Sequence, residues 1–252
     1  MKFTHGVGHL AVVSILALCA GTATAAPVSW TGAGDGITWT NPANWSSNPA
    51  LPGPADDVTI NVAGTPSITL NANASIRSLN TSETLTITGL NRTLTISTTA
   101  VATANLTIDD GARISGGAWD VSAASLRVGN GQNSNSNSIL GAAVSGDIVL
   151  PSNSSRVTID VASSFTRVRM QGLNSGLFLN PGTVITGEIR CEATSNTTSV
   201  ELTSAGALTL AASGSIIMAP GAGGTFQIGP SYWIGSNLTT FTVNGTISNQ
   251  SA

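Results

Sequence analysis

The sequence predicts an all-β protein and, within that class, a right-handed parallel β-helix. Three observations support this prediction. Short runs alternate between apolar and polar residues, the runs start about every nine residues in the regular stretches, and few turns between them suit a tight hairpin. Charged residues make up only 8% of the chain, against about 25% in a typical globular domain. Hydroxyl, amide and glycine groups must therefore supply most of its polar surface.

The alternating runs continue along almost the whole chain after residue 57. Val58–Val62, Leu85–Thr88 and Leu106–Asp109 are typical, with aliphatic residues at every second position and threonine, asparagine or aspartate between them. In a strand, this order places the aliphatic side chains on one face and the polar ones on the other. Many runs are only three or four residues long, and none has the spacing of an amphipathic helix.

Two all-β architectures fit this spacing. A β-sandwich joins its strands by hairpins, whereas a solenoid winds them into coils and stacks each strand on its counterpart in the next coil. The short strands, the interchangeable aliphatic residues and the scarcity of turn dipeptides such as Asp110-Gly111 and Asn244-Gly245 favour the solenoid. The sandwich is the alternative. At three strands and about 25–30 residues per coil, we expect about seven coils.

Residues 1–25 predict a cleaved signal peptide. Lys2 precedes an apolar stretch, Leu10–Ala20, and Ala23-Thr24-Ala25 supplies the small residues of a cleavage site. The stretch is shorter than the roughly 20 apolar residues that span a bilayer. The leucine before Cys19 is too large for the lipoprotein alternative. We therefore expect the mature chain to be exported.

Removal of residues 1–25 leaves a mature chain without lysine or histidine. Lys2, His5 and His9 are the only residues of these two types, so eight arginines face twelve carboxylates and the net charge becomes −4. This acidic balance argues against nucleic acids and anionic membrane surfaces as partners. Cys191 is the single remaining cysteine, which excludes an intrachain disulfide and a cysteine-based zinc site.

The segment 26–57 is rich in tryptophan and glycine. It contains Trp30, Trp39 and Trp45, three of the five tryptophans of the chain. Because each indole can bury a large apolar area, we expect this segment to form a cap over the open end of the first coil. The alternative is a ligand platform, in which Trp39 and Trp45 stack against sugar rings.

Five short motifs follow one another within residues 28–60, namely Trp30-Thr31-Gly32, Gly36-Ile37-Thr38-Trp39, Asn44-Trp45, Pro52 and Asp56-Asp57-Val58-Thr59-Ile60. This series resembles the start of exported bacterial β-helix surface proteins, of the kind that carry autotransporter-associated β-strand repeats or a PEP-CTERM sorting tail. The resemblance implies a secreted or surface-exposed β-helix with an adhesive or structural role. It does not say how this chain is anchored, because neither a barrel nor a sorting tail is among its 252 residues.

No catalytic group is predicted. Without histidine, the mature chain cannot form a Ser-His-Asp or Cys-His arrangement. Asp56-Asp57 and Asp109-Asp110 are adjacent carboxylates, but neighbouring residues on a strand point to opposite faces. Asp110-Gly111 also indicates a turn. We therefore predict a protein that is not an enzyme and uses no cofactor, with a polysaccharide-active β-helix enzyme as the alternative.

Calcium is the metal that the sequence could accommodate. Asp35, Asp56 and Asp57 lie near glycine turns, whose backbone carbonyls can add oxygen ligands. Neither an EF-hand loop nor a calcium-binding nonapeptide repeat is present. The alternative is that these three carboxylates stabilise turns of the cap.

Two segments interrupt the strand pattern. Gly129–Ser138 is a low-complexity polar run, which we interpret as a solvated insertion, the alternative being a recognition loop. Pro220–Gly224 lacks the lysine and the following helix of a phosphate-binding loop, so it predicts a turn.

We expect the mature chain to be secreted or displayed on the outer cell surface as a structural or adhesin-like module. Residues 58–252 form the predicted solenoid, and their strand pattern reaches the end of the sequence. We therefore expect a truncated C-terminus or one capped by assembly. Surface glycans or other cell-surface proteins are the expected partners, together with end-to-end self-association through open strand edges. We expect no membrane insertion of the mature chain, and a carbohydrate-binding module is the alternative function.

Overall fold

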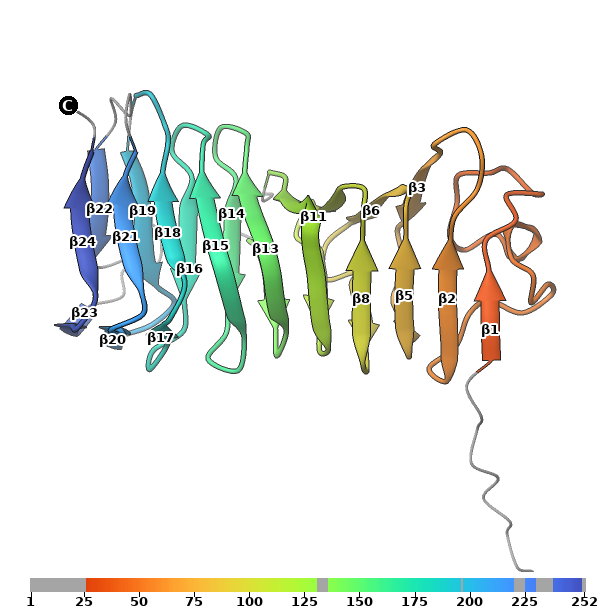
Figure 1. Ribbon diagram of the computed structural model, residues 1–252, viewed down its shortest axis with the longest axis horizontal. Coiled ribbons are helices and arrows are strands. Elements are labelled where there is room, and N and C mark those ends of the chain that lie inside the picture. The colour runs from red at the N-terminus through yellow and green to blue at the C-terminus, as the bar shows by residue number, and fades with distance from the viewer. Residues whose placement is uncertain (1–25, 131–135, 196, 220–224, 230–237, 251–252) are drawn as a thin grey trace, which may run out of the picture.

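The computed structural model is a parallel β-solenoid of about seven turns, and it describes residues 26–130, 136–195, 197–219, 225–229 and 238–250. The coils stack along one axis, with β1 at one end and β24 at the other (Figure 1). Every ladder between its named strands is parallel, for example Val58 beside Leu79 and Leu79 beside Ala100. The predicted parallel β-helix is thus confirmed, because a sandwich of hairpins would pair its strands antiparallel.

Three faces run along the solenoid. Face A consists of β1 (Ala26–Ser29), β2 (Asp56–Ile60), β5 (Ser78–Thr81), β8 (Thr99–Ala102) and the N-terminal halves of β11 (Ala118–Val128), β13 (Ala143–Leu150) and β15 (Ser164–Met170). Face B consists of β3 (Ser67–Leu70), β6 (Thr84–Thr88), β9 (Leu106–Asp109), the C-terminal halves of β11, β13 and β15, and then β18 (Glu188–Cys191), β21 (Ser215–Met218) and β24 (Thr246–Asn249).

Face C is a separate ladder of eight strands. It consists of β4 (Ala74–Ile76), β7 (Thr93–Ile96), β10 (Arg113–Ser115), β12 (Asn137–Leu140), β14 (Arg156–Ile159), β16 (Gly176–Leu179), β19 (Thr197–Leu202) and β22 (Thr225–Gly229). After β15, a three-stranded sheet takes the place of face A. It consists of β17 (Val184–Ile185), β20 (Gly206–Leu210) and β23 (Leu238–Val243).

The long strands β11, β13 and β15 cross the corner between faces A and B and join the two faces into one sheet. The register shifts between Val121 and Leu126 and between Val144 and Asp147, so each crossing contains a bulge. Gly146 lies at the second crossing with φ +105°, and an added Cβ there would lie 2.7 Å from the carbonyl carbon of Val121. The corner therefore needs glycine at this position.

The coils are shorter than the predicted 25–30 residues in the first half of the solenoid. Val58 pairs with Leu79, and Leu79 pairs with Ala100, a step of 21 residues each time. The step from Glu188 to Ser215 is 27 residues. Strands of three to five residues with tight corners therefore build the early coils, and longer loops lengthen the late ones.

Aliphatic rows fill the interior. On face B, one inward row contains Ile68, Leu85, Leu106, Leu126 and Ile148, none of them more than 1% exposed. Burial of each such side chain contributes about 1.5–3 kcal/mol. The predicted alternation is confirmed, because the residues between them on each strand point outward.

The corner after β9 is the predicted turn. Asp110 and Gly111 both have positive φ, +58° and +79°. The amide of Gly111 donates to Oδ1 of the fully buried Asn137, whose Nδ2 donates to the carbonyl of Gly129. Asn137 thereby anchors the base of the polar loop to the stack. The middle of that loop, the predicted signal peptide and the predicted turn at Pro220–Gly224 lie outside the described residues.

The predicted cap covers the N-terminal strand edges of two faces. On face A, β1 pairs with β2, and the amide of Trp30 donates to the carbonyl of Thr59. On face B, the amide of Trp39 donates to the carbonyl of Thr69, and the amide of Thr69 donates to the carbonyl of Ile37. Backbone groups that would otherwise form open edges are thus hydrogen-bonded within the chain.

The tryptophan rings form the interior of this cap. The ring centroids of Trp30 and Trp45 are 4.8 Å apart and those of Trp39 and Trp45 are 4.7 Å apart, both with edge-to-face geometry. Nε1 of Trp45 donates to the carbonyl of Trp39 at 2.7 Å. The segment between the rings contains the short 3-10 helix η1 (Pro42–Asn44).

At the opposite end, β22, β23 and β24 are the last described strands of their sheets. Val243 is 47% exposed and Ile247 is 52% exposed, although Ile247 continues the inward row of Ile216. End-to-end self-association through this end stays a prediction. Among the described residues, no helix is both long and apolar enough to cross a membrane.

Replacement of a cap tryptophan should destabilise the solenoid. We expect Trp45→Ala to lower the free energy of unfolding by about 3–5 kcal/mol, because it removes a buried indole that contacts two others. Ile37→Ala is the control from the same segment, because Ile37 is 55% exposed. Urea unfolding followed by circular dichroism measures both variants, and equal shifts for the two would contradict the cap.

Candidate ligand-binding groove

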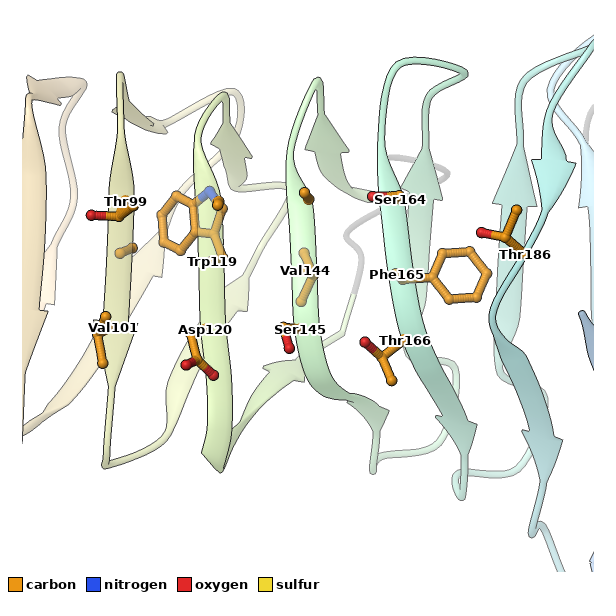
Figure 2. A pocket seen from close by; sticks show the side chains of 13 residues that line it. Thr99, Val101, Trp119, Asp120, Val144, Ser145, Ser164, Phe165, Thr166 and Thr186 are labelled. Atoms are coloured by element: carbon orange, nitrogen blue, oxygen red, sulfur yellow. The ribbon is translucent and has the colours of Figure 1, made fainter. Parts of the chain in front are cut away.

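A shallow groove of about 530 Å³ lies on face A and runs across successive coils. It crosses β8, β11, β13 and β15 and ends near Thr186, just after β17 (Figure 2). Most of its outward-facing side chains are short, being alanine, serine or threonine. Those that border it are Thr99, Val101, Ala118, Asp120, Ala143, Ser145, Ser164, Thr166 and Thr186.

Strand register explains why these side chains form a continuous groove. Thr99, Ala118, Ala143 and Ser164 occupy one outward row, each in register with the next. Figure 2 shows a second row below it, in which Asp120 lies between Val101 and Ser145. Because parallel strands are about 4.8 Å apart, equivalent side chains repeat along the groove at that interval.

The inward row between these two outward rows contains two aromatic residues, Trp119 and Phe165. Trp119 is 1% exposed and its Nε1 donates to the carbonyl of Gly116 at 2.7 Å. Phe165 is 8% exposed and lies where the ladder of face A stops. Beyond it, β15 pairs with β18 only from Arg167 onward. Figure 2 shows the ring of Phe165 pointing towards Thr186, across this break in the sheet.

Asp120 is the charged side chain among the described lining residues. Its Oδ1 accepts hydrogen bonds from the Oγ of Ser122 at 2.6 Å and from the amide of Ser122 at 3.0 Å. These bonds hold the pKa of Asp120 below its usual value. The groove therefore presents an ionised carboxylate beside hydroxyl and small apolar groups.

A second feature, the charged cluster, lies on face B over β13, β15 and β18. Arg167 and Arg169 each pair with carboxylates from both neighbouring coils, whereas Arg190 pairs with carboxylates of its own coil. The cluster consists of Asp147, Arg167, Arg169, Glu188, Arg190 and Glu192. Its charges cancel, and six of the twenty charged residues of the mature chain are gathered here.

Glu192 holds the cluster together. Arg169 and Arg190 are directly opposite each other in register, which brings two like charges together. Glu192 accepts from both, through Nη2 of Arg169 at 2.9 Å and Nε of Arg190 at 3.2 Å. Burial opposes its ionisation, but hydrogen bonds from Arg169 and Gln171 outweigh that effect and keep the pKa of Glu192 below its usual value.

The predicted calcium ligands are not brought together. Oδ1 of Asp35 accepts from the amides of Ile37 and Thr38 and from Nδ2 of Asn44, at 2.7–3.0 Å. These bonds keep the pKa of Asp35 far below its usual value. Asn44 is fully buried, and its Oδ1 accepts from the amides of Gly34 and Gly36. Asp35 therefore stabilises a turn of the cap.

The other two candidates also have local partners. Oδ2 of Asp56 accepts from the amide of Gly53 at 2.7 Å. Asp57 pairs with Arg77 and accepts from Ser78 in the next coil, and the bond from Arg77 lowers its pKa. Within the described ranges, no three His, Cys, Asp or Glu side chains gather as a metal site. Asp35 and Asp56 thus have the turn-stabilising role that the sequence left as the alternative, whereas Asp57 forms an ion pair with the next coil.

The predicted sugar-stacking tryptophans lie inside the cap. Trp39 and Trp45 are each 1% exposed, so neither ring presents a face on which a sugar could stack. Their geometry supports the cap, and the groove on face A is a concave surface separate from these rings. Its residues carry no local motif, and they come together only through the register of four coils.

The fold defines the chain as a parallel β-solenoid with a tryptophan-rich cap. No protein-family model, no curated protein and no solved structure matches it.

Loss of the carboxylate at Glu192 should weaken the fold, and the effect should depend on pH. We expect Glu192→Gln to lower the free energy of unfolding by about 1 kcal/mol at pH 7, because it removes two partly exposed ion pairs. The pKa of Glu192 is lower when folded than when unfolded. Its contribution is therefore complete above the unfolded value of about 4.3 and is lost as pH falls through the folded value.

Unfolding at pH 7 and pH 3 measures this dependence. The difference between wild type and Glu192→Gln should shrink at pH 3, because this is below the unfolded pKa and protonation of the carboxylate then favours the unfolded chain. An equal difference at both pH values would show that Glu192 acts through packing and not through its charge.

Proposed function

We propose that this chain is an exported β-solenoid module, secreted or displayed on the cell surface, that binds an extended glycan along the groove of face A. In this proposal it acts as a structural or adhesive element and performs no catalysis. The observation that carries the proposal is the groove itself, which presents equivalent outward positions of successive coils in one line.

The repeat of the groove suits a linear polymer. Between β8 and β15 the strands are spaced by about 4.8 Å, so a chain of repeating units lying along the solenoid axis meets similar side chains at each step. The hydroxyls of Ser145, Ser164 and Thr166 can exchange hydrogen bonds with sugar hydroxyls. The short side chains of Ala118 and Ala143 leave room for a sugar ring, and their methyl groups can contact the apolar face of that ring.

Electrostatics are compatible with the same ligand. The groove carries the ionised Asp120 and no described cation among its lining residues. A neutral glycan can donate hydroxyl hydrogen bonds to this carboxylate, and such charge-assisted bonds are stronger than neutral ones. A polyanionic ligand would instead be repelled. We therefore favour neutral glycans over sulfated or uronate-rich ones.

Export is supported by the sequence. Residues 1–25 have the order of a signal peptide, and residues 28–60 resemble the start of bacterial surface β-helix proteins. A solenoid with few charged groups and many hydroxyls also fits a structural surface element, because its stability comes from stacked aliphatic rows and backbone ladders.

Filling the groove should abolish glycan binding. We expect Ala143→Trp to weaken binding of neutral polysaccharides at least tenfold on a glycan array, because an indole would occupy the middle of the groove. Ala123→Trp is the matched control, because Ala123 is an exposed alanine of β11 that does not line the groove.

Two outcomes would contradict the proposal. Equal binding by wild type and Ala143→Trp would remove the groove as the site. Release of reducing sugar from a bound polysaccharide would favour the alternative, a polysaccharide-active enzyme, over a non-catalytic module.

A further inference from the structure

A second, polar pocket of about 350 Å³ lies on face C, away from the groove of face A. It lies over β14, β16, β19 and β22 and the turns that precede β14 and β16. The side chains around it are almost all polar. They include Arg156, Asn174, Thr197, Ser199, Glu201 and Gln227.

Two glycines lie in the outward rows beneath this pocket. One outward row runs through Arg156, Gly176, Ser199 and Gln227, each in register with the next. Gly176 has no side chain, and the ring of Phe178 lies over it, with Cε2 2.9 Å from the position of an added Cβ. In the neighbouring row, Gly229 is in register with Glu201, and among the described residues no atom lies within 4 Å of an added Cβ at Gly229. In β22, the position in register with Glu201 therefore carries no side chain.

Glu201 is a buried acid with an unused acceptor. The residue is 5% exposed. Its Oε1 accepts from the Oγ of Ser199 at 2.6 Å, whereas its Oε2 is buried and has no hydrogen-bond partner. A buried carboxylate oxygen without a donor is costly, because it has lost its water and gained nothing in return. Glu201 is one of the residues that line the pocket, so a donor brought there by a ligand would satisfy this oxygen once the carboxylate turns towards it.

We propose that this pocket binds an amino sugar, with the protonated amine of the sugar donating to Oε2 of Glu201. An ammonium group carries three donors and a positive charge, so its bond to a buried carboxylate is stronger than that of a neutral hydroxyl. The amides of Asn174 and Gln227 also line the pocket and offer donors and acceptors to sugar hydroxyls. The volume suits one monosaccharide unit.

Free amino acids, like amino sugars, carry an ammonium group beside oxygen acceptors. Titration calorimetry of the full chain with glucosamine, N-acetylglucosamine, glucose and lysine distinguishes these sources. We expect glucosamine to bind at least about tenfold more tightly than the other three, since only it combines the ammonium with the sugar hydroxyls. Equal affinity for N-acetylglucosamine would show that the ammonium charge is not needed. Equal affinity for lysine would show that the pocket does not recognise the sugar ring.

The variant Glu201→Gln tests the residue itself. It keeps the size of the side chain and removes its charge, so we expect at least a tenfold loss of glucosamine affinity with an unchanged or higher melting temperature. Glu188→Gln, in the charged cluster on face B, is the matched control and should keep full affinity. Unchanged glucosamine binding in Glu201→Gln would overturn the proposal.

Two further variants complete the test. Gln227→Ala covers the case in which Glu201→Gln does not fold, and Ala143→Trp separates this site from the proposed function. Gln227 is exposed at the rim, so Gln227→Ala should fold normally and weaken glucosamine binding severalfold. Unaltered affinity in this variant would count against the pocket. Ala143→Trp, which fills the groove on face A, should leave glucosamine binding unchanged, and a loss there would place the amino sugar in the groove instead.

Discussion

Parallel hydrogen bonding of each coil to the next is the constraint on which the rest of this structure depends. A single coil of about 21 residues can neither pair its own backbone nor bury its own aliphatic row. Ile68, Leu85 and Leu106 become buried only because three coils stack in register. Outward positions are then free of packing demands, which is why threonine, serine and asparagine can fill them in a chain with only 8% charged residues.

The same constraint makes the ends of the stack costly, because each end exposes unpaired strand edges. At the N-terminal end, the chain uses a segment of its own. β1 covers the edge of face A, and the stretch from Ile37 to Trp39 covers the edge of face B at Thr69. Asn44, fully buried, connects the turns of this segment through Gly34 and Gly36. The tryptophans therefore stabilise the end of the stack, and because they are buried they cannot act as a ligand platform.

Surfaces with a capacity for binding arise where the regular stack is altered. On face A, short outward side chains and the break in the ladder at Phe165 leave a groove. On face C, polar side chains from three coils surround a pocket that includes Glu201. On face B, the same stacking instead brings Arg169 and Arg190 together, and a shared carboxylate neutralises them. One fold thus offers an apolar-edged groove, a polar pocket and a self-neutralised cluster on three separate faces.

The sequence by itself determined the strand alternation, the inward aliphatic rows, the turn at Asp110-Gly111 and the capping role of the tryptophan-rich segment. These are local properties, because a period of two and a preference for positive φ are set by neighbouring residues. Only the tertiary structure decided the 21-residue coil, the groove and the pocket beside Glu201. Their residues lie in different coils, and corner length and backbone pairing set the register between coils. Arg156 and Glu201 could not be placed in one pocket from spacing alone, since the coils between them differ in length.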